Sequence, residues 1–245
     1  MASRSDNRHD MLTGRGSDAP LPPTITKAGE GGKFDLSGQA LHFPGNTFIC
    51  HIDPTSKPFA ALKALQTGIK SGPAGSYFAY LPPASFHMTV FPAICGDPLG
   101  HDGWPERLAQ GADLETVTAA FQNDLQDHSF FDTCTVQATD LYAGYSVTVE
   151  GAAPDDRAKL QAARDILQEV TGLKRPDFTH YFFHITLCYR LKWMPDDVAD
   201  AHLAHMARLF DTHRADLQTI KLGPIEFCIF DTMEEFRKLQ VLPSG

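Results

Sequence analysis

The sequence lacks any run of apolar residues near the roughly 20 that a membrane-spanning helix needs, and no basic amphipathic segment stands out. We therefore expect no membrane role. The first 33 residues also lack the apolar core of a signal peptide and are rich in Ser, Gly, Pro and charged residues. This composition predicts a mobile leader over residues 1–33, followed by one two-lobed domain over residues 34–245.

Cysteine is scarce, and its spacing fits neither a disulfide framework nor a zinc site. The five cysteines form no Cys-x-x-Cys pair, and all lie in or beside apolar stretches. Because disulfides belong to oxidising compartments, this usage predicts reduced core residues and a cytoplasmic protein. Cys188 shares strand parity with His184, but packing is the favoured interpretation.

Basic residues are in the minority, with 21 against 30 acidic ones and a formal net charge of −9. Proteins that bind long nucleic acids use basic residues on their surface to neutralise the phosphates. The charge balance therefore argues against a long duplex as partner. If the chain handles phosphate, the ligand is a small molecule or a short RNA end.

Several catalytic motifs are also missing. The glycines at residues 29–32 lack the spacing of a phosphate-binding loop, and no Gly-x-Ser-x-Gly elbow occurs. His202-x-x-His205 and His180-x-x-x-His184 lack the Glu of a His-Glu-x-x-His zinc site. No metal and no cofactor is predicted.

One short sequence motif occurs twice, at residues 86–90 (FHMTV) and 183–187 (FHITL). Each copy is an aromatic residue, then His-x-Thr, then an aliphatic residue. Side chains alternate between the two faces of an extended strand. His87 and Thr89 therefore lie on the same face of one predicted strand, and His184 and Thr186 lie on the same face of the other. Two copies in matching surroundings are much stronger evidence than one.

The surroundings do repeat. Each motif follows an apolar strand and a segment with helical periodicity, and each is followed by another helix and another strand. The predicted helices are 58–70, 113–127, 154–171 and 196–211, and the predicted strands besides the motifs are 46–52, 133–142, 145–149, 220–230 and 236–242. This order predicts an α+β fold with two pseudo-symmetric lobes.

These residues resemble the two-histidine (2H) phosphoesterase superfamily, which includes LigT-like RNA cyclic phosphodiesterases. The resemblance rests on the paired His-x-Thr motifs and the duplicated order of elements, and it covers roughly residues 41–242. It implies a bilobal duplication in which each lobe is an antiparallel sheet with helices on its outer face. The lobes interleave around a central groove that the two motifs face, without a metal. Family members cleave or form cyclic phosphodiesters, and the branch most similar to "LPPASFHMTVFPAI" has no assigned substrate.

The chemistry can also be argued from the residues. Opening a cyclic phosphodiester with water needs a base and an acid, and two imidazoles with pKa values near ~6.5 can divide these roles at neutral pH. The hydroxyls of Thr89 and Thr186 can donate hydrogen bonds to phosphate oxygens. We therefore predict His87, Thr89, His184 and Thr186 as catalytic residues. The pseudo-symmetric sequence leaves open which His is the base.

Weaker candidates for substrate contact are Arg190, Tyr80, Tyr142 and Tyr181. Arg190 has the strand parity of His184 but lies six residues away, about 20 Å in an extended strand. The tyrosines can stack on a planar group, although aromatic residues beside strands more often belong to the core.

Two functional hypotheses remain. The first is a metal-independent phosphoric diester hydrolase acting as a monomer on a small cyclic phosphodiester of the 2′,3′-cyclic nucleotide type, or on a short RNA end. The second is a non-catalytic protein that binds a phosphorylated small ligand or an RNA end. Two matched acid/base groups favour the enzyme, because a binding protein needs phosphate donors only.

Overall fold

The computed structural model describes residues 7–100 and 103–245. The helices are α1 (Arg8–Thr13), α2 (Lys57–Ser71), α3 (Leu114–Asp124), α4 (Pro154–Thr171) and α5 (Asp196–His213). The strands are β1 (Gly45–His51), β2 (Phe78–Tyr80), β3 (His87–Cys95), β4 (Cys134–Tyr142), β5 (Ser146–Gly151), β6 (His184–Thr186), β7 (Cys188–Arg190), β8 (Ile220–Leu222), β9 (Glu226–Thr232) and β10 (Glu235–Val241). The fold class is α+β, as the sequence predicts.

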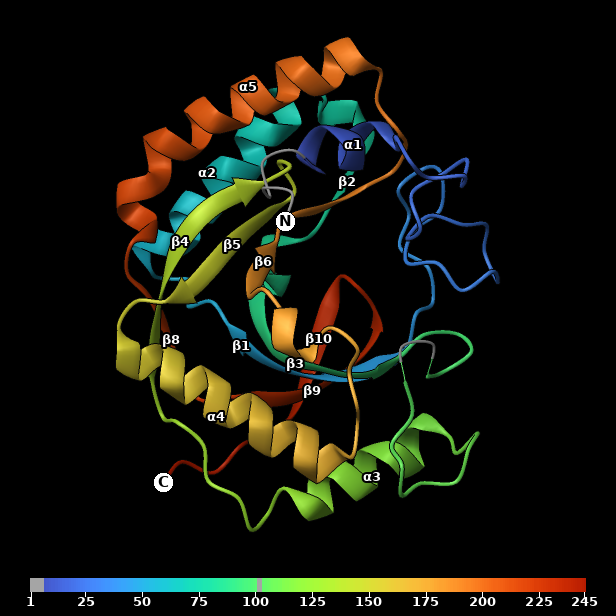
Figure 1. Cartoon of the computed structure of the whole chain (residues 1–245), viewed down its shortest axis with the longest axis vertical. Helices are drawn as coiled ribbons and strands as arrows, with labels where there is room; N and C mark the ends of the chain where they lie inside the picture. The colour runs from blue at the N-terminus through green and yellow to red at the C-terminus, as the bar shows by residue number, and fades with distance from the viewer. Residues whose placement is uncertain (1–6, 101–102) are drawn as a thin grey trace.

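One curled antiparallel sheet of eight strands forms the centre of the molecule, in the order β10-β9-β1-β3-β6-β5-β4-β8 (Figure 1). Its two halves meet where β3 pairs with β6 at Met88 and Ile185. These are the two motif strands, so the duplicated His-x-Thr segments are neighbours at the middle of the sheet. A small second sheet pairs β2 with β7.

The two halves exchange strands. β4 follows the first motif in the chain but pairs with β5 in the second half-sheet, and β9 follows the second motif but pairs with β1 in the first. Each lobe is therefore completed from the other half of the sequence, the first by β9 and β10 and the second by β4. The lobes are interleaved, and the groove between them is built from both.

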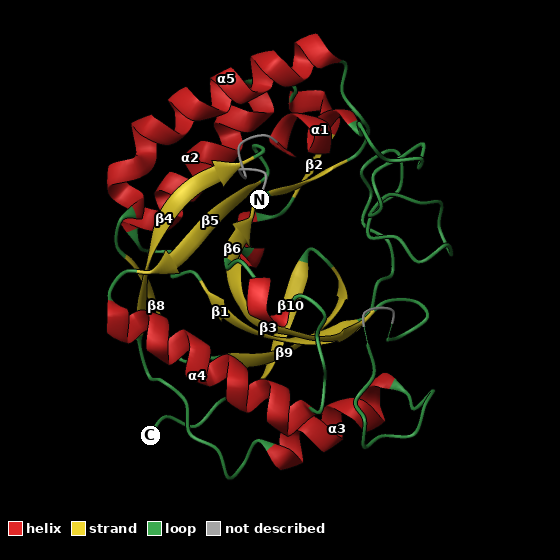
Figure 2. Ribbon diagram, viewed as in Figure 1, coloured by secondary structure: helices red, strands yellow, loops and turns green. Residues whose placement is uncertain are grey.

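Helices cover the outer side of the half-barrel (Figure 2). α2 packs on α5, which contacts β4, whereas α4 contacts both β3 and α3. Local signals set their ends: the Ser56 side chain accepts a hydrogen bond from the Phe59 backbone at the start of α2, and Pro154 opens α4. The four predicted helices are all present. None of the described helices is long and apolar enough to cross a bilayer.

The predicted strand over residues 220–230 is wrong in one respect, because the structure divides it into β8 and β9. The break falls at Gly223 and Pro224, and Pro has no N–H to donate to a strand partner. The two pieces lie in opposite halves of the sheet, β8 beside β4 and β9 beside β1.

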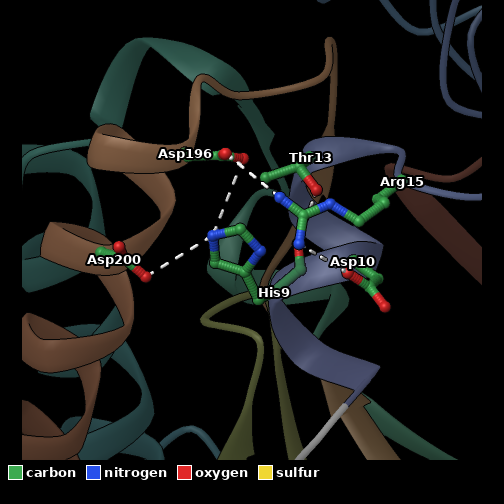
Figure 3. Close-up of polar contacts among 6 residues, drawn as sticks. All are labelled: His9, Asp10, Thr13, Arg15, Asp196 and Asp200. Carbon is green, nitrogen blue, oxygen red and sulfur yellow. Dashed lines mark hydrogen bonds and ion pairs between the residues drawn. The ribbon is translucent and has the colours of Figure 1, made fainter.

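The N-terminal segment packs on the body of the molecule, which differs from the mobile leader predicted for residues 1–33. Figure 3 shows how α1 is tied to α5: His9 Nε2 lies 3.5 Å from Asp200 Oδ1, and Arg15 Nη2 lies 3.1 Å from Asp196 Oδ2. On its inner side Leu12 is fully buried. Residues 1–6 of the predicted leader lie outside the described residues.

The same segment is anchored again before β1. Ile25 and Phe34 are buried in the main core, and an isolated parallel β-bridge pairs their backbones. Composition averaged over 33 residues hides these few apolar anchors, which is why the sequence predicted mobility.

Candidate active site

The four residues predicted as catalytic line a single cavity of about 250 Å³. His87 and Thr89 come from β3, and His184 and Thr186 from β6. Met88 and Ile185, the residues between each pair, are fully buried on the opposite face. Strand alternation thus sends the apolar residues into the core and the imidazoles and hydroxyls into the groove.

The two histidines are held in the same way. His87 Nδ1 lies 2.7 Å from the carbonyl oxygen of Ser85, and His184 Nδ1 lies 2.8 Å from that of Phe182, two residues upstream in both cases. Because a carbonyl only accepts, Nδ1 is the donor in each ring and carries the proton. Nε2 is then the basic nitrogen on both imidazoles.

Both imidazoles are biased toward the neutral form. Burial lowers the pKa of His87 to about 4, with further lowering by the nearby charges of His51 and His184 and opposition from the Ser85 carbonyl. Burial also lowers the pKa of His184, and the charge of Lys33 adds to that effect. A buried imidazole regains its proton readily only when an anion lies beside it.

The cavity is also lined by polar side chains that were not predicted from the sequence. Among them are Lys33, Arg175, Asp177 and Tyr189. Arg175 Nε lies 3.5 Å from Asp177 Oδ1. Lys33 precedes β1, and Arg175 lies in the connection between α4 and β6. No local sequence pattern marks either residue, because only tertiary packing brings them to the groove.

The weaker candidates fall into two groups. Tyr181 lines the cavity of the two histidines, and Tyr142 lines an adjoining cavity of about 530 Å³ that also reaches Tyr181 and His184. Tyr142 is held by its hydroxyl, which lies 2.7 Å from Met11 Sδ of α1. Both tyrosines therefore border the space around His184.

Tyr80 and Arg190 line neither cavity, which differs from their predicted contact with substrate. The Tyr80 hydroxyl donates to the Gly75 carbonyl at 2.8 Å. The Arg190 guanidinium lies 4.8 Å from the Trp193 ring centroid and 5.7 Å from that of Tyr145. β6 ends at Thr186 and β7 pairs with β2 in the separate sheet, so the strand parity that linked Arg190 to His184 does not extend that far.

A cluster that could ligate a metal lies beside His87. Donor atoms of His51, Glu226 and Cys228 all lie within 4.8 Å of one another. His51 Nδ1 contacts the Glu226 carboxylate, whose other oxygen lies 3.0 Å from Lys238 Nζ. Burial alone would raise the pKa of Glu226, but the hydrogen bonds from His51 and Lys238 lower it, and burial raises the pKa of Cys228 to about 12. Glu226 already has His51 and Lys238 as hydrogen-bond partners, and the thiol resists ionisation.

Comparison with known proteins finds a family model that matches part of the chain. The sequence model of the family described as 2H-phosphodiest, a domain of unknown function (DUF1868), matches residues 33–145. Over this region, a little under half of the chain, the protein is similar to the 2H phosphoesterase superfamily. The matched region includes His87 and Thr89, whereas His184 and Thr186 lie beyond it. This similarity supports phosphoesterase activity in general.

The fold has a solved counterpart. The crystal structure of a conserved protein of unknown function from Agrobacterium tumefaciens strain C58 is similar to this chain, with 26% sequence identity and a TM-score of 0.87. The similarity covers 95% of this chain and 97% of the other. No curated protein matches the sequence.

Proposed function

We propose that this protein is a metal-independent phosphoesterase that hydrolyses a cyclic or other small phosphodiester, of the 2′,3′-cyclic nucleotide type, by paired-histidine acid–base catalysis. The observation that carries the proposal is the matched pair of imidazoles, each with Nδ1 on a carbonyl and both in one cavity with Thr89 and Thr186. Such a site supplies base, acid and phosphate donors from four side chains.

In the proposed reaction one Nε2 takes a proton from water as the water oxygen attacks phosphorus. The bond from phosphorus to one ring oxygen breaks, and the second histidine gives its proton to the departing alkoxide. The product is a phosphomonoester with a free hydroxyl. Thr89 and Thr186 donate hydrogen bonds to the non-bridging oxygens, where negative charge is concentrated in the transition state.

The surroundings favour His87 as the base in this direction. Its pKa of about 4 keeps the imidazole unprotonated at neutral pH, and the neighbouring charge of His51 supports that state. The strand partner of His184, by contrast, is Thr148 and not a histidine. A bound phosphate anion offsets the burial of His184 and favours its protonated, acidic form.

The alternative is a protein that binds a phosphorylated small ligand or an RNA end without turnover. The matched tautomers favour catalysis, because phosphate binding alone would be served better by protonated imidazoles or by arginine than by two rings biased toward neutrality. The net charge of −9 favours a small ligand or a short RNA end over a long duplex. We treat the protein as a monomer in this proposal.

The test is a hydrolysis screen in EDTA. The substrates are the four nucleoside 2′,3′-cyclic phosphates, ADP-ribose cyclic phosphate and an oligonucleotide with a cyclic end, assayed by phosphomonoester formation. We expect turnover of at least one substrate that EDTA does not reduce and that the double variant His87→Ala/His184→Ala lacks. Binding without turnover in every case would favour the alternative. Activity lost in EDTA and recovered with zinc would contradict metal independence and implicate His51, Glu226 and Cys228, which Cys228→Ser would then test.

A further inference from the structure

Lys33 lies in the cavity of the two histidines although it belongs to neither lobe of the duplicated core. It stands in the N-terminal segment, which runs along the side of the molecule from α1 to β1 (Figure 1). Its side chain is half-buried. The segment therefore forms part of the groove wall.

The backbone of Lys33 is fixed on both sides. Its N–H donates to the Thr24 carbonyl at 2.8 Å, and its carbonyl accepts from the Leu41 N–H at 2.9 Å. The next residue, Phe34, is 1% exposed and is anchored in the core. Because the main chain is held in this way, the Lys33 side chain has a defined starting point and direction toward the groove.

Aromatic rings, not carboxylates, surround the Lys33 ammonium. Nζ lies 5.2 Å from the ring centroid of Phe43 and 5.3 Å from that of Tyr189. Among the residues that the structure describes, no carboxylate forms an ion pair with it. Cation–π contacts position an ammonium without cancelling its charge. The other cation on the cavity wall, Arg175, has Asp177 within 3.5 Å.

The charge of Lys33 acts on the site. It is one of the influences that lower the pKa of His184. An anion bound between them would be attracted by the ammonium and would also favour the protonated imidazole. A phosphodiester, which carries one negative charge, has the chemistry to do both.

We propose that Lys33 is a substrate-binding residue that contacts the non-bridging oxygens of the phosphodiester, and that the segment preceding β1 is thereby a working part of the active site. This inference rests on the proposed function for the identity of the substrate. The binding of a phosphate group by Lys33 does not depend on turnover and can be tested alone.

The experiment compares Lys33→Met, which keeps length and removes charge, with Lys33→Arg and with Lys27→Met as a matched control. Lys27 is exposed on the same segment. Binding of inorganic phosphate is measured by calorimetry for every protein, and kcat and KM are measured on the best substrate of the wild type. Thermal unfolding shows whether each variant is folded.

We expect Lys33→Met to weaken phosphate binding and to raise KM by about 10- to 100-fold, the size of one lost charge-assisted hydrogen bond. Lys33→Arg should recover part of the loss, and Lys27→Met should match the wild type. Because Lys33 lowers the pKa of His184, Lys33→Met should also raise the pH at which free His184 titrates, read from its ring protons by NMR.

Unchanged phosphate binding in folded Lys33→Met would overturn the inference, whatever the activity of the wild type. A wild type that hydrolyses no phosphodiester but loses phosphate affinity in Lys33→Met would support Lys33 and contradict the proposed hydrolysis. The two failures are therefore distinguishable.

Discussion

His51 lies directly across from His87 on neighbouring strands, with the two ring centroids 6.2 Å apart. The second half of the sheet has Thr148 opposite His184 at the same position. His51 contacts the carboxylate of Glu226. The pseudo-symmetric site is thus chemically asymmetric, because the strand partner of His87 is an imidazole that lowers its pKa and the strand partner of His184 is a threonine.

This asymmetry predicts a pH effect. The charge of His51 contributes to the low pKa of His87, so His51→Gln should raise that pKa from about 4 toward its ordinary value. If His87 is the base, the acidic limb of kcat/KM should move to higher pH, while the alkaline limb should move less. His42→Gln, at an exposed position, serves as the control. An unchanged profile would show that His51 does not act on His87 through charge.

Removal of either candidate catalytic imidazole should abolish most of the rate. General acid or base catalysis is worth about 10²–10⁴-fold per group, so His87→Ala and His184→Ala should each lose that much in kcat. The double variant should be little worse than the worse single variant, because the two groups act as a unit. His213→Ala, at the end of α5, controls for the loss of a histidine elsewhere. A single variant with near wild-type turnover would refute the paired mechanism.

The hydroxyls of Thr89 and Thr186 should matter less than the imidazoles. Loss of one oxyanion donor costs at most about 2.7–4 kcal/mol, and water in an open groove can partly replace it. Thr89→Ala and Thr186→Ala should therefore reduce kcat/KM by less than about 10³-fold. Thr89→Ser and Thr186→Ser keep the hydroxyl and should retain most activity. Equal losses in the Ala and Ser variants would point to the methyl group and not to hydrogen bonding.

Two histidines should make the fold sensitive to acid. Burial lowers the pKa values of both His87 and His202 to about 4. In the unfolded chain a histidine titrates near ~6.5, so between these pH values the unfolded state binds more protons and stability falls as pH falls. Protonation of each histidine should lower the free energy of unfolding by at most about 3 kcal/mol at pH 4. Above pH 6.5 both histidines are neutral in the folded and unfolded states, and none of this free energy is lost.

Urea unfolding at several pH values between 7 and 4.5 measures this slope. His202→Leu should flatten the dependence of the unfolding free energy on pH, because the fully buried His202 no longer titrates. Phe210→Leu, a buried position on the same helix, should lower stability by a similar amount at every pH. A His202→Leu protein with the wild-type slope would assign the acid sensitivity to other groups.

Much of the site could be predicted from the sequence because its signals are local. The period of two in a strand places His87 with Thr89 and His184 with Thr186, whatever the rest of the fold does. Helical periodicity marked α2, α3, α4 and α5 within a few residues of their observed ends. The repeated His-x-Thr motif and the duplicated order of helices and strands then predicted two lobes and a shared groove.

Tertiary structure alone decided the remainder. The exchange of β4 and β9 between lobes, the division of residues 220–230, and the arrival of Lys33 at the histidines depend on pairings between distant segments. The sequence could not separate Tyr181, which borders the groove, from Tyr80, whose hydroxyl is bonded to Gly75. Short-range periodicity specifies which face a side chain takes on its own element, whereas the burial and charge around it are set by elements far away in the chain.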